Sequence, residues 1–109
     1  MTYIFLSLSI VCEVVATTAL KASDSFTRLW PGAIAVVFYV LAFYLLTVPM
    51  RTIPTGVIYA IWSGAGIVLI GLTSWLVYDQ KLDTAAVAGI ALILTGVVVI
   101  NIFSKTVGH

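Results

Sequence analysis

Four long apolar stretches limit what this chain can fold into more than any other feature of its sequence. They cover residues 3–20, 29–50, 53–78 and 84–104, and the one charged residue within them is Glu13. Crossing the hydrocarbon core of a bilayer takes about 20 residues of helix, and isolated strands leave backbone groups unsatisfied there. We therefore expect an all-α integral membrane protein in which each stretch forms one spanning helix.

The composition supports a membrane fold. Charged residues make up 8% of the chain and hydrophobic residues 62%, whereas soluble domains carry roughly a quarter charged residues. This balance excludes a soluble enzyme, a disordered tail and a secreted disulfide scaffold. The net charge of +1 argues against a nucleic-acid partner, and a single cysteine, Cys12, permits neither an intrachain disulfide nor a thiolate metal cage.

The first stretch is the shortest and resembles a secretory signal peptide in length. It lacks a basic N-terminal region, carries Glu13 in its apolar part and has no convincing small-residue cleavage site. We therefore assign it as a helix. The connections at 21–28, 51–52 and 79–83 are short, so consecutive helices should lie side by side and antiparallel. The whole chain, residues 1–109, is expected to form one four-helix membrane domain.

The basic residues scarcely favour either orientation in the membrane. Four spans place Arg51 and Lys105 on one side and Lys21, Arg28 and Lys81 on the other. The positive-inside rule counts such residues in short loops, and two against three is almost no bias. A chain that inserts both ways can pair with an inverted copy of itself, as inverted repeats do in larger transporters. One weakly determined orientation is the alternative.

Glu13 is the candidate functional residue. It lies ten residues after Tyr3, about 15 Å along a helix, and no basic residue lies in any span to neutralise it. A charge at that depth costs roughly 2.5–3.5 kcal/mol on insertion scales, and intramembrane acids mark transport pathways. Such an acid can hold a proton or a cation, but hardly both, which is the minimum requirement for proton-coupled exchange. A permanently protonated glutamic acid bonded to a neighbouring helix is the alternative.

Helical spacing predicts the surroundings of this acid. Side chains three, four and seven residues away share its face and are small or modest, which leaves room for a cavity. Aromatic residues in the second and third spans suit a lipophilic organic cation through cation–π attraction, although aromatic packing alone is also consistent. The Glu13 face holds Leu6, Ser9, Ile10, Ala16, Thr17 and Leu20; the aromatic faces hold Tyr39 with Phe43, and Tyr59 with Trp62, Ser63 and Gly66.

Glycines mark two further features. Gly64 and Gly66 interrupt the third span, where they permit either a hinge or close helix packing. A stripe of small and aliphatic residues in the last span predicts a dimer contact rather than a surface exposed to lipid. Its members are Gly89, Leu92, Ile93, Gly96 and Val97. Dimerisation through this helix leaves the first three helices of each chain to enclose a chamber that two Glu13 carboxylates face.

The chain resembles the small multidrug resistance family of bacterial inner-membrane efflux proteins over essentially its whole length. The likeness rests on several segments together with the glycine stripe of the last span. These segments are Cys12-Glu13-Val14, Phe26-Thr27-Arg28-Leu29-Trp30-Pro31, Ile53-Pro54-Thr55-Gly56 and Tyr59-Ala60-Ile61-Trp62-Ser63-Gly64.

The resemblance implies an antiparallel, dual-topology homodimer that exports toxic cations in exchange for protons. It implies that Glu13 of both chains forms the shared proton and substrate site, and that the stripe from Gly89 to Val97 is the dimer motif. No cofactor or metal is implied. By position, the family's substrate chamber corresponds to Leu6, Ser9, Ile10, Ala16, Thr17, Tyr39, Phe43, Tyr59, Trp62 and Ser63.

Within that family the chain looks like the quaternary ammonium and multidrug branch. Ser63 follows Trp62 where guanidinium exporters typically have threonine, and Ala16 stands where they typically have tryptophan. Ser9 departs from the alanine of the multidrug members. Its hydroxyl, one turn from Glu13, is expected to hydrogen-bond the carboxylate and so to affect substrate range and working pH.

Two other functions remain open from the sequence. The chain fits an exporter of guanidinium-like metabolites, and it also fits a membrane scaffold that assembles partner subunits without transport. Catalysis is not expected, because the sequence has no nucleophile–base pair and no metal-ligand cluster. Its one histidine, His109, lies in the C-terminal tail.

Overall fold

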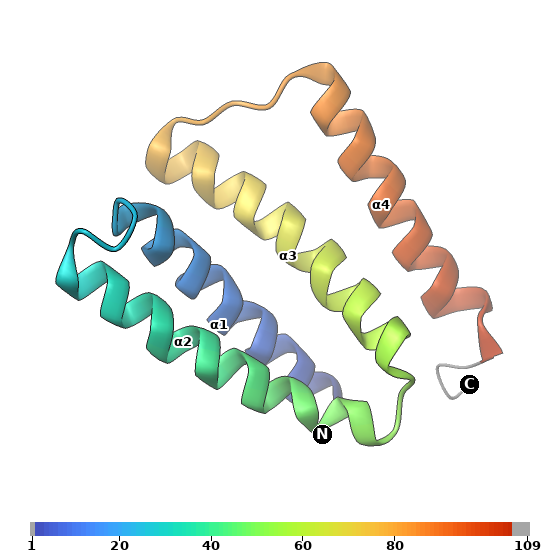
Figure 1. Cartoon of the computed structure of the whole chain (residues 1–109). Helices are drawn as coiled ribbons and strands as arrows, with labels where there is room; N and C mark the ends of the chain where they lie inside the picture. The colour runs from blue at the N-terminus through green and yellow to red at the C-terminus, as the bar shows by residue number, and fades with distance from the viewer. Residues whose placement is uncertain (1, 106–109) are drawn as a thin grey trace. The chain divides into compact units, whose positions relative to one another are not determined.

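The structure, a computed structural model, describes residues 2–105, and His109 lies outside them. Four α-helices occupy the described part of the chain (Figure 1): α1 (Thr2–Ala22), α2 (Leu29–Thr47), α3 (Thr55–Tyr78) and α4 (Thr84–Phe103), with a 3-10 turn at Pro49–Arg51 after α2. Each helix is long and apolar enough to cross a membrane. The predicted all-α architecture with four spans is therefore confirmed.

Three helix ends differ by two or three residues from the predicted ends, and proline and charge account for these differences. α2 ends at Thr47 rather than at residue 50, since Pro49 has no N–H to continue the helical ladder. α3 begins at Thr55 rather than at residue 53, because Pro54 disfavours a helical conformation at the residue before it. α1 extends to Ala22, and Lys21 in its last turn interacts favourably with the helix dipole.

A tight turn joins α1 to α2. The three residues Asp24, Ser25 and Phe26 have φ angles of 48°, 60° and 64°, in the left-handed region. The buried Ser23 hydroxyl stabilises this turn, since it donates to the Leu20 carbonyl at 2.7 Å and accepts from the Phe26 N–H at 3.1 Å. This turn reverses the chain and returns α2 alongside α1.

The chain divides after Pro49 into two compact units. In the first unit, α1 and α2 pack closely along their length. Ala16, Ala35 and Ala42 have no solvent exposure, and small side chains of this kind allow helix backbones to approach closely in lipid. Whether both units form the single domain expected from the sequence stays a prediction.

The second unit contains α3 and α4, joined by an extended segment. Asp79 ends α3 in a left-handed conformation (φ 54°), and its N–H bonds the Ser74 carbonyl. The Asp83 carboxylate caps α4 by accepting from the Ala86 N–H at 2.9 Å. The two helices make far fewer close approaches than α1 and α2, and no residue of α4 is buried.

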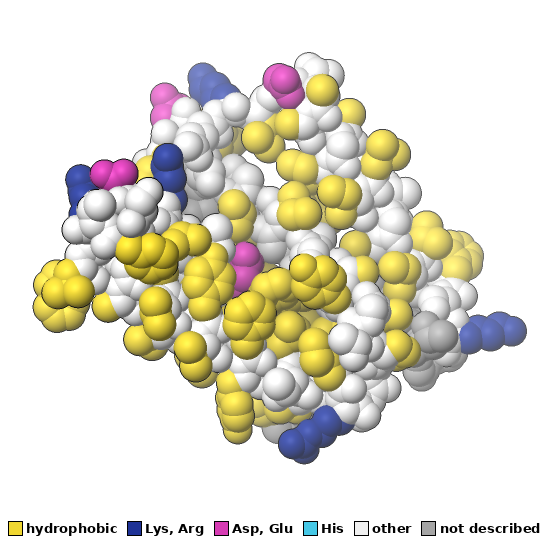
Figure 2. All heavy atoms as spheres, in the orientation of Figure 1, with side chains coloured by type: hydrophobic (Ala, Val, Ile, Leu, Met, Phe, Trp, Pro, Cys, Tyr) yellow, Lys and Arg dark blue, Asp and Glu magenta, His cyan; other side chains and the backbone are white. Residues whose placement is uncertain are grey.

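The surface of the chain is apolar along the helices. Figure 2 shows hydrophobic side chains over much of the visible face, with most charged side chains gathered near the helix ends. Large exposed side chains include Leu29, Trp30, Leu76, Leu92 and Phe103. In water such a surface would promote association, but it suits helices that face lipid or another chain.

Candidate functional site

The carboxylate of Glu13 lies in the middle of α1 and is partly buried. Its Oε1 accepts a hydrogen bond of 3.0 Å from the Thr17 hydroxyl, one helical turn later. Its Oε2 is buried and has no hydrogen-bond partner among the described residues. Within residues 2–105 no group of acidic, histidine or cysteine side chains has the arrangement of a metal site. One oxygen of the acid is therefore held, and the other is a buried acceptor without a partner, which a bound proton would satisfy.

Tyr39 of α2 extends this contact into a hydrogen-bonded chain. Its hydroxyl lies 2.6 Å from the Thr17 hydroxyl. A threonine hydroxyl has one proton, so when Thr17 donates to an ionised Glu13 it must accept from Tyr39. The resulting chain runs from Tyr39 through Thr17 to Glu13. The sequence placed all three residues near one another, and the four-residue spacing of Glu13 and Thr17 was the signal for the first contact. The second contact depends on how α2 packs against α1.

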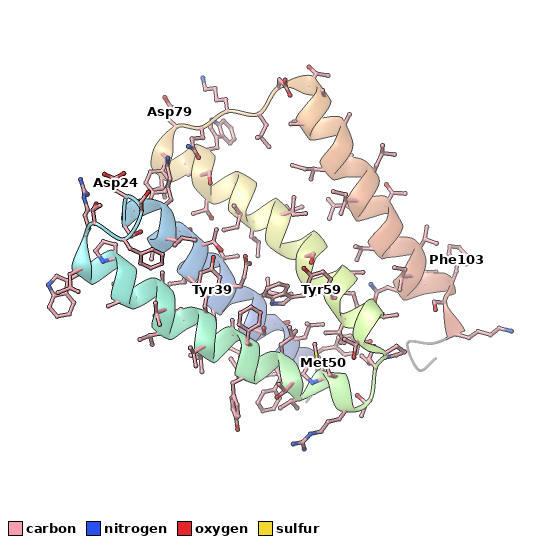
Figure 3. The ribbon with its side chains drawn as sticks, viewed as in Figure 1. Asp24, Tyr39, Met50, Tyr59, Asp79 and Phe103 are labelled. Atoms are coloured by element: carbon pink, nitrogen blue, oxygen red, sulfur yellow. The ribbon has the colours of Figure 1, made fainter. Side chains whose placement is uncertain are left out.

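The aromatic pair predicted in α2 is present. The rings of Tyr39 and Phe43 are stacked, with centroids 6.4 Å apart and planes inclined by 20°. Phe43 is half exposed. Figure 3 labels Tyr39 on α2. The two rings therefore present an aromatic surface next to the hydrogen bond between Tyr39 and Thr17.

Ser9 differs from its expected role. Its hydroxyl proton is directed at the carbonyl oxygen of Ala42 in α2, at 2.7 Å, and not at Glu13. The reason is helix packing: Ser9 is fully buried, and its face meets the backbone of α2 where Ala42 leaves space. The expected hydrogen bond from Ser9 to the carboxylate is therefore wrong, and Thr17 fills that role.

The other predicted chamber residues of α1 are also buried. Leu6, Ile10 and Ala16 have exposures of 3%, 8% and 0%, whereas Glu13 and Thr17 on the same helix remain partly accessible. Their membership of the chamber stays a prediction.

In the second unit, Tyr59 and Trp62 form another aromatic pair on α3. Their ring centroids are 6.0 Å apart and the planes are inclined by 29°. Tyr59, which Figure 3 labels on α3, is 60% exposed, and Ser63 next to Trp62 is partly buried. The exposed ring of Tyr59 gives α3 an aromatic surface of its own.

The predicted hinge glycines lie within an uninterrupted helix. A Cβ on Gly64 would come within 2.7 Å of the Val97 Cγ2 and 3.8 Å of the Ile93 Cγ2, both in α4. No real side chain tolerates the first of these distances without movement. Gly64 therefore serves close packing of α3 on α4, and the hinge at Gly64 and Gly66 stays a prediction.

The contact at Gly64 separates the residues of the α4 stripe into two groups. Val97 and Ile93 approach Gly64 of the same chain. In contrast, a Cβ on Gly89 or Gly96 would meet nothing within 4 Å, and Leu92 is 74% exposed. These last three residues are the part of the stripe that is open to a partner.

Comparison with known proteins places this arrangement in a family. Residues 1–93 match the sequence model of the Small Multidrug Resistance protein family. A multidrug transporter of Pseudomonas aeruginosa is 53% identical over 107 residues, which cover 98% of this chain and 97% of that protein. At the same coverage, the quaternary ammonium compound-resistance protein QacE of Escherichia coli and the multidrug transporter EmrE of Escherichia coli K12 are each 48% identical.

These matches agree with the resemblance found in the sequence and with the four spans of the structure. The family model covers most of the chain, and the relatives match it from end to end. The protein is therefore a multi-pass membrane protein. The chain belongs to the small multidrug resistance family.

Proposed function

We propose that this protein is a proton-coupled antiporter that exports lipophilic and quaternary ammonium cations from the cell by alternating access. The observation that carries the proposal is the state of Glu13, with one oxygen bonded to Thr17 and the other buried without a partner. A group in that state is suited to exchange one positively charged partner for another. The names of the relatives, which refer to multidrug transport and quaternary ammonium resistance, support the same class of cargo.

The transporting unit is an antiparallel homodimer in the bacterial inner membrane. The near balance of basic residues between the two sides supports insertion in both orientations. Gly89, Leu92 and Gly96 form an open surface on α4, and small residues there allow a second helix to approach closely. Pairing through α4 leaves the Glu13 residues of both chains for one shared site.

The transport cycle rests on competition at this site. Protons occupy the two Glu13 carboxylates until an organic cation displaces them, and charge attraction together with cation–π contacts offsets the dehydration of the cation. Tyr39, Phe43, Tyr59 and Trp62 supply the aromatic contacts. Loading changes the balance of inward-open and outward-open states because the cation binds them unequally. Protons then displace the cargo on the outer side.

The hydrogen-bonded chain gives the two forms of Glu13 different partners. When Glu13 is ionised, Tyr39 donates to Thr17 and Thr17 donates to the carboxylate. When Glu13 carries a proton, its hydroxyl can donate to Thr17, and Thr17 can donate to Tyr39. These hydrogen bonds among Tyr39, Thr17 and Glu13 can thus be kept in both forms of Glu13 without a change of fold. If two protons leave for one monovalent cation, export moves net charge and responds to voltage, at about 2.3 kcal/mol per charge per 100 mV.

The test is drug-driven proton movement in liposomes that contain purified protein. Wild-type protein should move protons when a quaternary ammonium gradient is applied, and Glu13→Gln, which keeps the size of the side chain but cannot ionise, should not. Glu13→Asp should retain exchange with a shifted pH profile. Undiminished drug-dependent proton flux from Glu13→Gln, at equal incorporation into liposomes, contradicts the proposal.

The same liposomes separate the other two functions. Ethidium should drive proton movement more strongly than guanidinium, whereas a guanidinium exporter shows the reverse order. A scaffold subunit shows no substrate-dependent current with either cation, and neutralisation of Glu13 then alters only assembly.

A further inference from the structure

A cavity of about 490 Å³ lies within the second unit, between the end of α3, the segment 79–83 and the beginning of α4. It involves none of the residues assigned to the cation site. Its lining consists of Val68, Gly71, Leu72, Trp75, Lys81, Leu82, Val87 and Ile90.

The lining is apolar apart from one cation. Lys81 is the only charged residue of this lining. The two neighbouring acids, Asp79 and Asp83, do not line the cavity, and the Asp83 carboxylate is committed to the N–H of Ala86. The cavity therefore presents a hydrophobic interior with one ammonium group in its lining, while the carboxylates of Asp79 and Asp83 lie outside the lining.

The position of these groups along the helices matches the layers of a bilayer. Lys81 lies between the end of α3 and the start of α4, at the level where spans leave the hydrocarbon. Val68 lies ten residues before the end of α3, which is about 15 Å along the helix and about the depth of one leaflet. The charged part of the cavity is thus at headgroup depth, and its apolar part follows the acyl chains.

We propose that this cavity binds one anionic phospholipid, with an acyl chain against Val68, Leu72 and Ile90 and the phosphate at Lys81. The positive charge disfavours the organic cations assigned to Glu13. A second copy of the chain is not the expected occupant, because Val87 and Ile90 lie on roughly the opposite face of α4 from Gly89 and Leu92. This lipid site does not depend on the transport function.

Quenching of Trp75 by brominated lipids tests the site directly. In a full-length chain with Trp30→Phe and Trp62→Phe, Trp75 is the remaining tryptophan. Vesicles of phosphatidylcholine would contain equal fractions of either brominated phosphatidylglycerol or brominated phosphatidylcholine. We expect the anionic lipid to occupy the site with a preference of about fivefold, the effect of one lysine near a lipid surface.

Matched variants identify the cause of that preference. Lys81→Gln should remove it, Lys81→Arg should keep it, and Lys21→Gln should leave it unchanged. Lys21 is the control because it has the same charge and lies on the same side of the membrane by the count of spans, but does not line the cavity. Gly71→Leu, which places a side chain in the cavity, should reduce quenching by both lipids while the lysine stays in place.

Three results overturn the proposal. Equal quenching by the two brominated lipids in the parent chain excludes recognition of the anionic headgroup. If the preference for the anionic lipid remains in Lys81→Gln, a group other than Lys81 causes it. If neither brominated lipid quenches Trp75, protein rather than lipid covers the cavity. Native mass spectrometry of the unsubstituted chain, which should retain phosphatidylglycerol over phosphatidylcholine, checks that the two tryptophan substitutions do not create the effect.

Discussion

The two helix pairs of this chain, α1–α2 and α3–α4, are similar in length and hydropathy. They differ in how closely the two helices of each pair pack against one another. α1 and α2 bury alanines along their contact and share a buried hydrogen bond between Ser9 and Ala42. α3 and α4 meet closely at Gly64, leave α4 without a buried residue, and enclose a cavity near their connection.

The difference in packing indicates different roles for the α1–α2 and α3–α4 pairs. Packing within the α1–α2 pair brings Tyr39 to the Thr17 hydroxyl, which in turn bonds Glu13. The α3–α4 pair leaves surfaces open for contacts outside the chain, and the proposals above give one face of α4 to a second copy and another to lipid. Substitutions that add or remove volume at matched positions test this assignment.

The largest effect is expected from Ala42→Leu in α2. Ala42 has no exposure and its carbonyl accepts from Ser9 of α1, so extra carbon atoms must force the two helices apart. Overpacking a close contact costs about 1–3 kcal/mol or more. The measurement is the free energy of unfolding in mixed micelles. The control is Ala91→Leu in α4, an exposed position where a change below about 0.5 kcal/mol is expected. Equal losses at both positions contradict the comparison.

A smaller loss is expected from Gly64→Ala in α3. The added methyl group would lie 2.7 Å from the Val97 Cγ2, so either the Val97 side chain must move or α3 and α4 must separate locally, at a cost of about 1–2 kcal/mol. Val97→Ala in the same chain should restore much of the stability because it removes the methyl group that collides. No rescue in the double variant means that Gly64 is required for a hinge or another contact instead of this packing.

The division of the stripe on α4 gives a third prediction. Gly96→Ala meets nothing within 4 Å in one chain, so the fold of the chain should be unchanged. If a second chain packs on this face, the added methyl group should weaken dimerisation by about 1 kcal/mol, or roughly fivefold in the dissociation constant. Förster transfer between labelled chains in liposomes measures it. Unchanged dimerisation excludes Gly96 from the interface.

The sequence was sufficient for the parts of this fold that depend on length and periodicity. Four long apolar stretches predicted the four helices, and the spacing of Tyr39 with Phe43 and of Tyr59 with Trp62 predicted both ring pairs. These features are local, because residues three or four apart on a helix must be neighbours.

Features that depend on which helices pack against one another could not be predicted from the sequence. The hydroxyl of Ser9 has Glu13 within one turn, yet it bonds a carbonyl 33 residues away because α2 covers that face. The collision between Gly64 and Val97 likewise joins two helices, and glycine spacing alone does not distinguish a bend from a contact. Similarly, the cavity beside Lys81 arises from the path of the connecting segment, which no periodicity describes.

Tyr39→Phe tests whether the contact between α1 and α2 contributes to cation binding. The change removes only the hydroxyl that bonds Thr17, so the ring pair with Phe43 remains. Loss of one hydrogen bond in the chain should weaken tetraphenylphosphonium binding at fixed pH by about 1 kcal/mol, roughly fivefold in Kd. Tyr44→Phe, which alters an exposed hydroxyl on the same helix, should have no effect. Equal Kd values for Tyr39→Phe and wild type would show that the hydrogen bond between Tyr39 and Thr17 does not contribute to cation binding.

The smallest effect is expected from Ser9→Ala, which removes the hydrogen bond to Ala42 but keeps the small side chain. The Ala42 carbonyl lies within α2, where it retains a helical hydrogen bond, so no buried acceptor is left without a partner. Side-chain hydrogen bonds between membrane helices average about 0.6 kcal/mol, and a loss of that size is expected in the free energy of unfolding. Ser9 does not bond Glu13, so the pH profile of drug binding should not change. A shifted profile with unchanged stability would place the Ser9 hydroxyl at the carboxylate during transport, in a conformation other than the one described here.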